Sequence, residues 1–243
     1  MTKEELMYQD SALLAKRALQ IQRGAARAAV LGVNDGLVST LCIVLGVAAA
    51  SGSQHTVLIA GFAGLVAGAI SMAAGEWISV TSQVDLFKGV LGDLRHMVKH
   101  DRELLSKQLQ DDFENSGLDP KTAKVAATEI ARDDEHLSAE YARNVMGINP
   151  EELGSPWVAA FSSFALFTIG SLVALAPWFF TASGKAIALS IIFTSIGGLL
   201  VGGYVSRTSG KSIPNGAIRQ LFIIAVASVV TYGVGYLFGT VVN

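Results

Sequence analysis

Five stretches of about twenty or more mostly apolar residues constrain this chain more than any other feature. A helix needs about 20 such residues to cross the hydrocarbon core of a bilayer. A soluble helical bundle would instead need a polar face on each helix. We therefore expect an all-α integral membrane protein with five transmembrane helices. These run roughly from Ala28 to Ala50, Thr56 to Val80, Trp157 to Phe180, Ala186 to Val205 and Leu221 to Val241.

Charged residues make up only 16% of the 243 residues, and most of them lie between the second and third stretches. The net charge of −2 gives no basic surface for nucleic acid. The single cysteine, Cys42, excludes an internal disulfide. This pattern predicts a cytosolic N-terminal segment (1–27), transmembrane helices 1 and 2 (28–83), a cytosolic helical insert (84–153) and transmembrane helices 3 to 5 (154–243).

Lys and Arg predict the orientation of the chain, because loops on the cytosolic side of a membrane are enriched in both. With the N-terminus in the cytosol, the insert and the connection between the fourth and fifth spans are also cytosolic, and of the 18 Lys and Arg residues only Lys185 falls outside. Residues 1–23 are polar and lack the apolar core of a cleavable signal peptide. We expect a cytosolic N-terminus and an external C-terminus in a multi-pass protein surrounded by lipid.

Polar residues within the first two spans are the candidate functional residues. Asp35 lies inside the first span, where a carboxylate costs about 2.5–3.5 kcal/mol on insertion scales. The second span contains Met72 and Glu76, and Met72 shares a face with a row of glycines. Charged residues inside the membrane usually face a bundle interior or an ion path.

The turn between these spans is centred near Ser53, with Asp35 eighteen residues before it and Met72 nineteen after it. Both residues therefore lie about 27–29 Å from the turn, at one depth in two antiparallel helices. A hard carboxylate beside a soft thioether suits a borderline transition metal. In the alternative interpretation, Met72 fills a gap between helices and Asp35 caps or bonds a broken helix. The spacing alone leaves both interpretations open.

Two motifs carry a resemblance to a known family. Residues 32–39, Gly-Val-Asn-Asp-Gly-Leu-Val-Ser, resemble the first-helix motif of the vacuolar iron transporter family. Residues 68–80, from Gly68 through Met72 and Glu76 to Val80, resemble its second-helix motif, in the bacterial form. The tail from Gly210 to Gly235 is also similar to bacterial members. The chain is thus identified as a bacterial-type member of this family.

The resemblance implies the function. Family members form homodimers with a path near the dimer axis, and export Fe²⁺, sometimes Mn²⁺, from the cytosol in exchange for protons. Asp35 and Met72 match the family's intramembrane metal positions, and Glu76 matches an acidic position of the bacterial motif. The metal ion is then a transported substrate, and no organic cofactor or enzymatic activity is expected. The bacterial form of the motif favours a prokaryotic inner membrane.

The pattern of the insert predicts two long helices and leaves room for a short third. The first continues the second span from Asp85 to about Asn115 and is broken at residues 116–118. Asp119 can cap the second helix, with Pro120 at its first position, and this helix runs to about Met146. The positions at which plant relatives bind metal hold other residues in this chain: Leu94, Met97, Leu105, Gln108, Tyr141, Ala142 and Val145.

A different set of acidic and histidine residues follows helical spacing in the insert. Bundles build di-metal sites from carboxylates and histidines at such spacing, but a charged face in solvent has the same pattern. The first stripe is Asp93, His96, His100 and Glu103, and the second is Glu129, Asp133, His136 and Glu140. If these stripes bind metal, the alternative function is a membrane-anchored ferroxidase or ferritin-like protein, which would leave Asp35 unexplained.

Overall fold

The computed structural model describes residues 24–51, 53–149 and 154–242. Most of the expected N-terminal segment lies outside the described residues. In the described part all regular elements are helices, and five of them are long and apolar enough to cross a membrane. The chain divides into two compact units, residues 1–78 with 156–243, and Ser79–Ser155. The long helix α3 (Gln54–His100) contributes its first half to unit 1 and its second half to unit 2.

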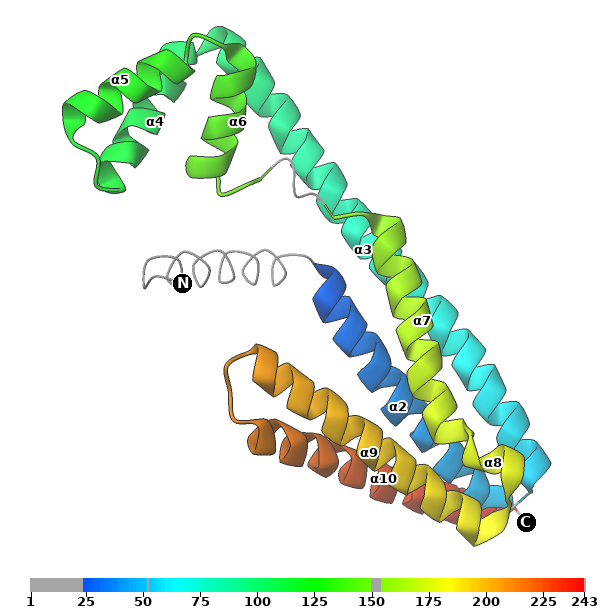
Figure 1. Cartoon of the computed structure of the whole chain (residues 1–243). Coiled ribbons are helices and arrows are strands. Elements are labelled where there is room, and N and C mark those ends of the chain that lie inside the picture. Colours follow the sequence, from blue (N-terminus) through cyan, green and yellow to red (C-terminus); the bar gives the residue numbers. More distant parts are fainter. Residues whose placement is uncertain (1–23, 52, 150–153, 243) are drawn as a thin grey trace. The chain divides into compact units, whose positions relative to one another are not determined.

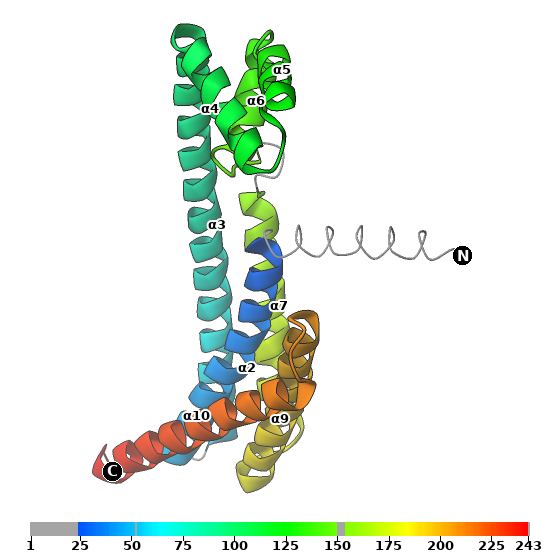
Figure 2. The same cartoon turned by 90° about the vertical axis from the view of Figure 1, so that its left-hand side faces the viewer.

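Unit 1 is built around α2, which packs against α7, α9 and α10 (Figures 1 and 2). The third span is shorter than expected, because Pro177 cannot continue α7 and begins the short helix α8. The fifth span begins eight residues earlier than expected, at Ile213. The helices of this unit besides α3 are α2 (Gly24–Ser51), α7 (Pro156–Leu175), α8 (Pro177–Phe180), α9 (Ser183–Thr208) and α10 (Ile213–Val242).

Small residues allow the backbones of α2 and α7 to approach closely. A Cβ atom on Gly36 would lie 3.0 Å from the backbone nitrogen of Ser171, and one on Gly170 would lie 2.9 Å from that of Leu37. The hydroxyl of Ser171 also donates a hydrogen bond to the carbonyl oxygen of Gly36. Close backbone approach of this kind stabilises helix pairs in lipid, where no hydrophobic force holds helices together.

The fifth span uses small residues in the same way against two neighbours. Towards its start, Gly216 faces Gly202 of α9. Towards its end, Gly235 faces Gly46 of α2, and Gly239 faces Ala50. The helix α10 therefore packs on α9 through its first half and on α2 through its second half.

A buried tryptophan of α8 forms hydrogen bonds with other helices of unit 1. Trp178 is fully buried, and its indole nitrogen donates to the hydroxyl of Ser190 at 3.1 Å. That hydroxyl donates in turn to the carbonyl oxygen of Ala174 at 2.8 Å. The side chain of Gln54, at the start of α3, donates to the carbonyl oxygen of Trp178 at 2.6 Å. These bonds join the ends of α3, α7 and α9 at one level.

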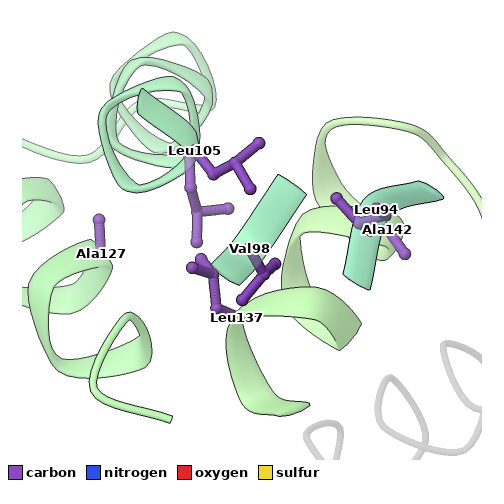
Figure 3. Close-up of a cluster of buried hydrophobic side chains, with 7 residues drawn as sticks. Leu94, Val98, Leu105, Ala127, Leu137 and Ala142 are labelled. Atoms are coloured by element: carbon purple, nitrogen blue, oxygen red, sulfur yellow. The ribbon is translucent and has the colours of Figure 1, made fainter. Parts of the chain in front are cut away.

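Unit 2 has its own apolar core, formed where the end of α3 meets three short helices (Figure 3). The three helices are α4 (Arg102–Asn115), α5 (Pro120–Ile130) and α6 (Asp134–Asn144). Leu137 of α6 is fully buried among residues of the other helices. The core residues are Leu94, Val98, Leu105, Leu109, Ala127, Leu137 and Ala142.

The two long helices expected in this unit are each interrupted, and the additional short helix that the sequence left open is present as α6. The first breaks at Asp101, between α3 and α4. The second breaks after Ile130, where Asp133 starts a new helix by accepting hydrogen bonds from the backbone N–H groups of Glu135 and His136. The predicted break after Asn115 and the cap of α5 by Asp119 are confirmed.

Candidate functional site

Asp35 lies on a face of α2 that the described chain leaves uncovered. Its neighbour Gly36 is buried against α7, while Asp35 itself is exposed. Leu31, one turn earlier on the same face, is 51% exposed. A carboxylate and an apolar side chain thus share an open face of a helix that the sequence places in the membrane. Because lipid does not solvate a carboxylate, this face requires a polar partner or water.

The contact of Gly36 with α7 places Asp35 near the middle of the membrane-spanning bundle. Gly36 faces the backbone of Phe167, which is close to the midpoint of the 20-residue helix α7. Trp side chains tend to mark membrane interfaces, and aromatic pairs join α3 to α7 and α8 on either side of this level. On one side Trp157 contacts Trp77, with ring centres 5.8 Å apart, and on the other Phe179 contacts Phe62 at 5.7 Å.

One side-chain contact relates the levels of α2 and α3. A Cβ atom on Gly64 of α3 would meet the side chain of Ile43 on α2. Asp35 lies eight residues before Ile43, and Met72 lies eight residues after Gly64. In antiparallel helices each is about 12 Å from the contact, in the same direction. By contrast, Gly68 faces the ring of Phe167, whose backbone faces Gly36, so the equal depth of Asp35 and Met72 stays a prediction.

Met72 and Glu76 lie further along α3 than the glycines that contact other spans. Each step of four residues turns about 40° around a helix, so Met72 lies about 80° and Glu76 about 120° from Gly64. Gly68 faces the ring of Phe167 on α7. Met72 and Glu76 are both half-buried. By contrast, a Cβ atom added to Gly75 would meet nothing within 4 Å, so Gly75 does not share in the packing of the predicted glycine row.

The histidine and acidic stripes of unit 2 are dispersed over several helices. Asp93, His96 and His100 lie on α3, whereas Glu103 lies on α4 beyond the break. The imidazoles of His96 and His100 stack with centres 4.3 Å apart, and Nδ1 of His100 lies 2.9 Å from the carbonyl oxygen of His96. Both histidines are exposed.

The second stripe has other partners. Glu129, at the end of α5, forms an ion pair with Arg132 at 2.9 Å. Asp133 caps α6, and the hydrogen bonds from the backbone N–H groups of His136 and Glu135 hold the pKa of its carboxyl below the usual value. Glu140 forms an ion pair with Arg143 at 3.3 Å. Across the described residues, no group of three His, Cys, Asp or Glu side chains is arranged to hold a metal ion.

The departures from the plant metal positions have a structural explanation. Leu94, Leu105 and Ala142 are buried in the core of unit 2. Tyr141 packs against this core and donates a hydrogen bond to Oε1 of Gln108 at 2.6 Å. Four of the expected ligand positions on this chain therefore build the fold of the unit.

Sequence reasoning missed one polar pair beside Asp35. The side-chain amide of Gln220 on α10 donates a hydrogen bond to Oδ1 of Asn34 on α2. Gln220 is only 7% exposed. The expected start of the fifth span at Leu221 leaves Gln220 in a loop, which is why the pair was missed. An amide at the edge of an apolar stretch was the signal that could have found it.

Together these features define a helical multi-pass membrane protein with a carboxylate on an open face of α2 and a half-buried thioether on α3. Residues 26–236 match the model of the VIT family, and the chain belongs to this family. It is 36% identical over 219 residues to a "Vacuolar iron transporter" of Acanthamoeba castellanii, with 88% of this chain and 78% of that protein covered.

Plant proteins are similar over the same share of the chain. "Vacuolar iron transporter homolog 1" of Oryza sativa subsp. japonica is 33% identical over 214 residues, covering 88% of this chain and 73% of the relative. "Vacuolar iron transporter homolog 2" of Arabidopsis thaliana is 31% identical over 214 residues, covering 88% and 84%. The family resemblance inferred from the two motifs is therefore confirmed.

Proposed function

We propose that this protein transports Fe²⁺ across a membrane through a site built on Asp35 and Met72. What supports the proposal is the position of Asp35 on an open face of α2, which contacts the middle of α7 through Gly36. Asp35 and Met72 also lie at similar sequence distances from the turn between their helices. The named relatives, which are iron transporters rather than enzymes, support the choice of substrate.

The chemistry of the pair favours a borderline divalent metal. Ca²⁺ and Mg²⁺ bind oxygen ligands and gain nothing from a thioether. Fe²⁺ accepts both a carboxylate and softer ligands, and Mn²⁺ accepts the carboxylate and water. We therefore propose Fe²⁺ as the main substrate and Mn²⁺ as a second one, with weaker dependence on Met72.

Glu76 is the residue that we propose for proton exchange. It lies one turn from Met72 on α3, about 6 Å further towards the end that continues into unit 2. A carboxylate that releases a metal can take up a proton in its place. Metal leaving the cytosol would then be exchanged for protons entering it, with the orientation that the Lys and Arg distribution predicts.

A second copy of the chain would complete the site. In the part of the chain that the structure describes, Asp35 lies on an open face of α2, and the proposed site takes one carboxylate and one thioether from each chain. A two-fold axis beside α2 would bring two copies of Asp35 and Met72 together and remove both carboxylates from lipid. We therefore propose a homodimer with the metal path at its axis.

The ferroxidase alternative gains no support from the geometry. Its ligands would be the two stripes of unit 2, but Asp133 caps a helix, and Glu129 and Glu140 are paired with arginines. We therefore place the function in unit 1.

Metal flux into proteoliposomes tests the proposal, with Fe²⁺ and Mn²⁺ offered in turn, each with and without a pH gradient. The proposal predicts flux of both metals, faster when the gradient drives protons in the direction opposite to the metal. Flux that ignores the gradient would contradict proton exchange but not metal transport. A folded protein with no flux of either metal would contradict the function itself.

A further inference from the structure

We propose that Gln220 is a positioning residue for the metal site, acting through Asn34 to hold the turn of α2 that carries Asp35. This inference rests on the proposed function, because it assigns Gln220 a role at that site. The hydrogen bond between Gln220 and Asn34 joins two residues 186 positions apart in the sequence. It connects α10 to the residue directly before Asp35.

The surroundings of Gln220 are shaped to receive its side chain. Two glycines of α9 lie against its stem: a Cβ atom on Gly198 would be 3.0 Å from Cγ of Gln220, and one on Gly202 would be 3.1 Å from Cβ. Any larger residue at these positions would displace the glutamine. The stem is thus packed against α9 while the amide reaches α2, so one side chain joins three helices.

A hydrogen bond from α10 to Asn34 acts on the residue next to Asp35. Successive residues of a helix lie about 100° apart around its axis, so the direction of Asn34 sets that of Asp35. On another side, Gly32 and Gly36 fix α2 against α7 through their backbones. The bond to Gln220 supplies a second anchor from a different direction. This bond thus adds a polar contact at the turn of α2 that carries Asp35.

Replacing Gln220 by an apolar residue would remove the hydrogen bond to Asn34. The oxygen of Asn34 would lose its donor in a half-buried position, where few alternatives exist. Asn34 would then turn towards another donor, which changes the local setting of the turn that carries Asp35. Groups that hydrogen-bond directly to a metal ligand change metal affinity by about 10–100-fold when they are altered, and Gln220 acts one residue further away, so its effect belongs to the low end of that range. We therefore expect the replacement to change metal affinity more than folding stability.

The test is a double-mutant cycle on Fe²⁺ flux in proteoliposomes, with Gln220→Met, Asn34→Leu and both together. Each single variant should raise the apparent KM for Fe²⁺ by about tenfold, with a smaller change in maximal rate. The double variant should be no worse than the poorer single variant, because both changes remove the same bond. The exchange Asn34→Gln with Gln220→Asn should restore part of the affinity.

Ser190→Ala is the matched control, because it removes a buried hydrogen bond between helices of the same unit at a distance from Asn34 in the fold. It should lower thermal stability without changing the KM. An unchanged KM in Gln220→Met, or effects of the two single changes that multiply in the double variant, would overturn the role of Gln220. Absence of flux in the wild-type protein would overturn the proposed function, and with it this inference.

Discussion

In the proposed site, Asp35 contributes a negative charge and Met72 contributes a soft sulfur ligand. The carboxylate attracts any divalent cation, whereas the thioether adds affinity only for metals that accept sulfur. Their similar distances from the turn between α2 and α3 predict that both contact one metal ion. The contribution of Met72 should therefore depend on the metal, and that of Asp35 should not.

Replacing Met72 by Leu keeps the volume of the side chain and removes its sulfur. We expect the apparent KM for Fe²⁺ to rise by roughly 3- to 10-fold, and that for the harder ion Mn²⁺ to change less. Competition between the two metals in one flux assay measures this directly. Equal changes for both metals would show that Met72 only fills space.

Asp133 offers a residue-scale prediction in unit 2. Its pKa is lowered in the folded protein by hydrogen bonds from the backbone N–H groups of His136 and Glu135. A lowered pKa in the folded state means that the stabilising effect is present above the pKa of the unfolded chain. It is lost as the pH falls through the folded value. The start of α6 should thus lose protection on acidification below about pH 4.

Hydrogen exchange on the full-length protein checks this effect. Asp133→Ala should accelerate exchange in α6 at neutral pH, because the helix loses its cap. Asp133→Asn is the matched control, since asparagine also caps a helix but does not titrate. It should keep protection at neutral pH and lack the acid-dependent change. An Asn variant with the acid response of the wild type would assign that response to another group.

At the scale of elements, the spans depend on backbone contacts at a few glycines. Gly36→Ala would place a methyl group against the backbone of Phe167, which cannot move aside as a flexible side chain can. We expect a loss of stability of about 1–3 kcal/mol, seen as a lower midpoint of thermal unfolding in detergent.

Gly75→Ala is the control for this substitution. Gly75 lies in the middle of α3 with open space around its Cβ position. Alanine is favoured over glycine inside a helix by about 1 kcal/mol, so this variant should be as stable as the wild type or more stable. A Gly36→Ala protein as stable as Gly75→Ala would contradict the close α2–α7 contact.

The sequence predicted most of these elements, because hydrophobic length identifies spans without tertiary information. It failed where single residues decide between continuing and ending a helix. Pro177 lies within a long apolar run, and the break at Asp133 is hidden by acidic residues that also suit an uninterrupted helix. The candidate pair of Asp35 and Met72 follows from spacing, whereas the bond of Gln220 to Asn34 depends on tertiary packing that no local pattern records.

At the scale of the whole molecule, the exposed carboxylate on α2 predicts a dimer. If α2 lies at a two-fold axis, Leu31→Cys, in a background with Cys42→Ser, should form a disulfide-linked dimer in membranes on mild oxidation. Leu31 is one turn from Asp35 on the open face, and 51% exposed in one chain.

Val229→Cys provides the control for cross-linking. Val229 is 73% exposed on α10 and lies on a face that we expect to contact lipid. The Val229→Cys variant should remain monomeric under the same oxidising conditions. A dimer linked through Val229 but not through Leu31 would place the axis beside α10 and contradict a shared site at Asp35.

The central claim is that metal crosses the membrane at Asp35, and Fe²⁺ flux through a matched pair of variants tests it most directly. Asp35→Asn keeps the shape of the side chain and removes its charge, whereas Asp93→Asn makes the same change on the exposed surface of unit 2. The account predicts that Asp35→Asn reduces flux by at least about 100-fold in a folded protein, while Asp93→Asn retains it. Undiminished flux in Asp35→Asn, or an equal loss in both variants, would contradict it.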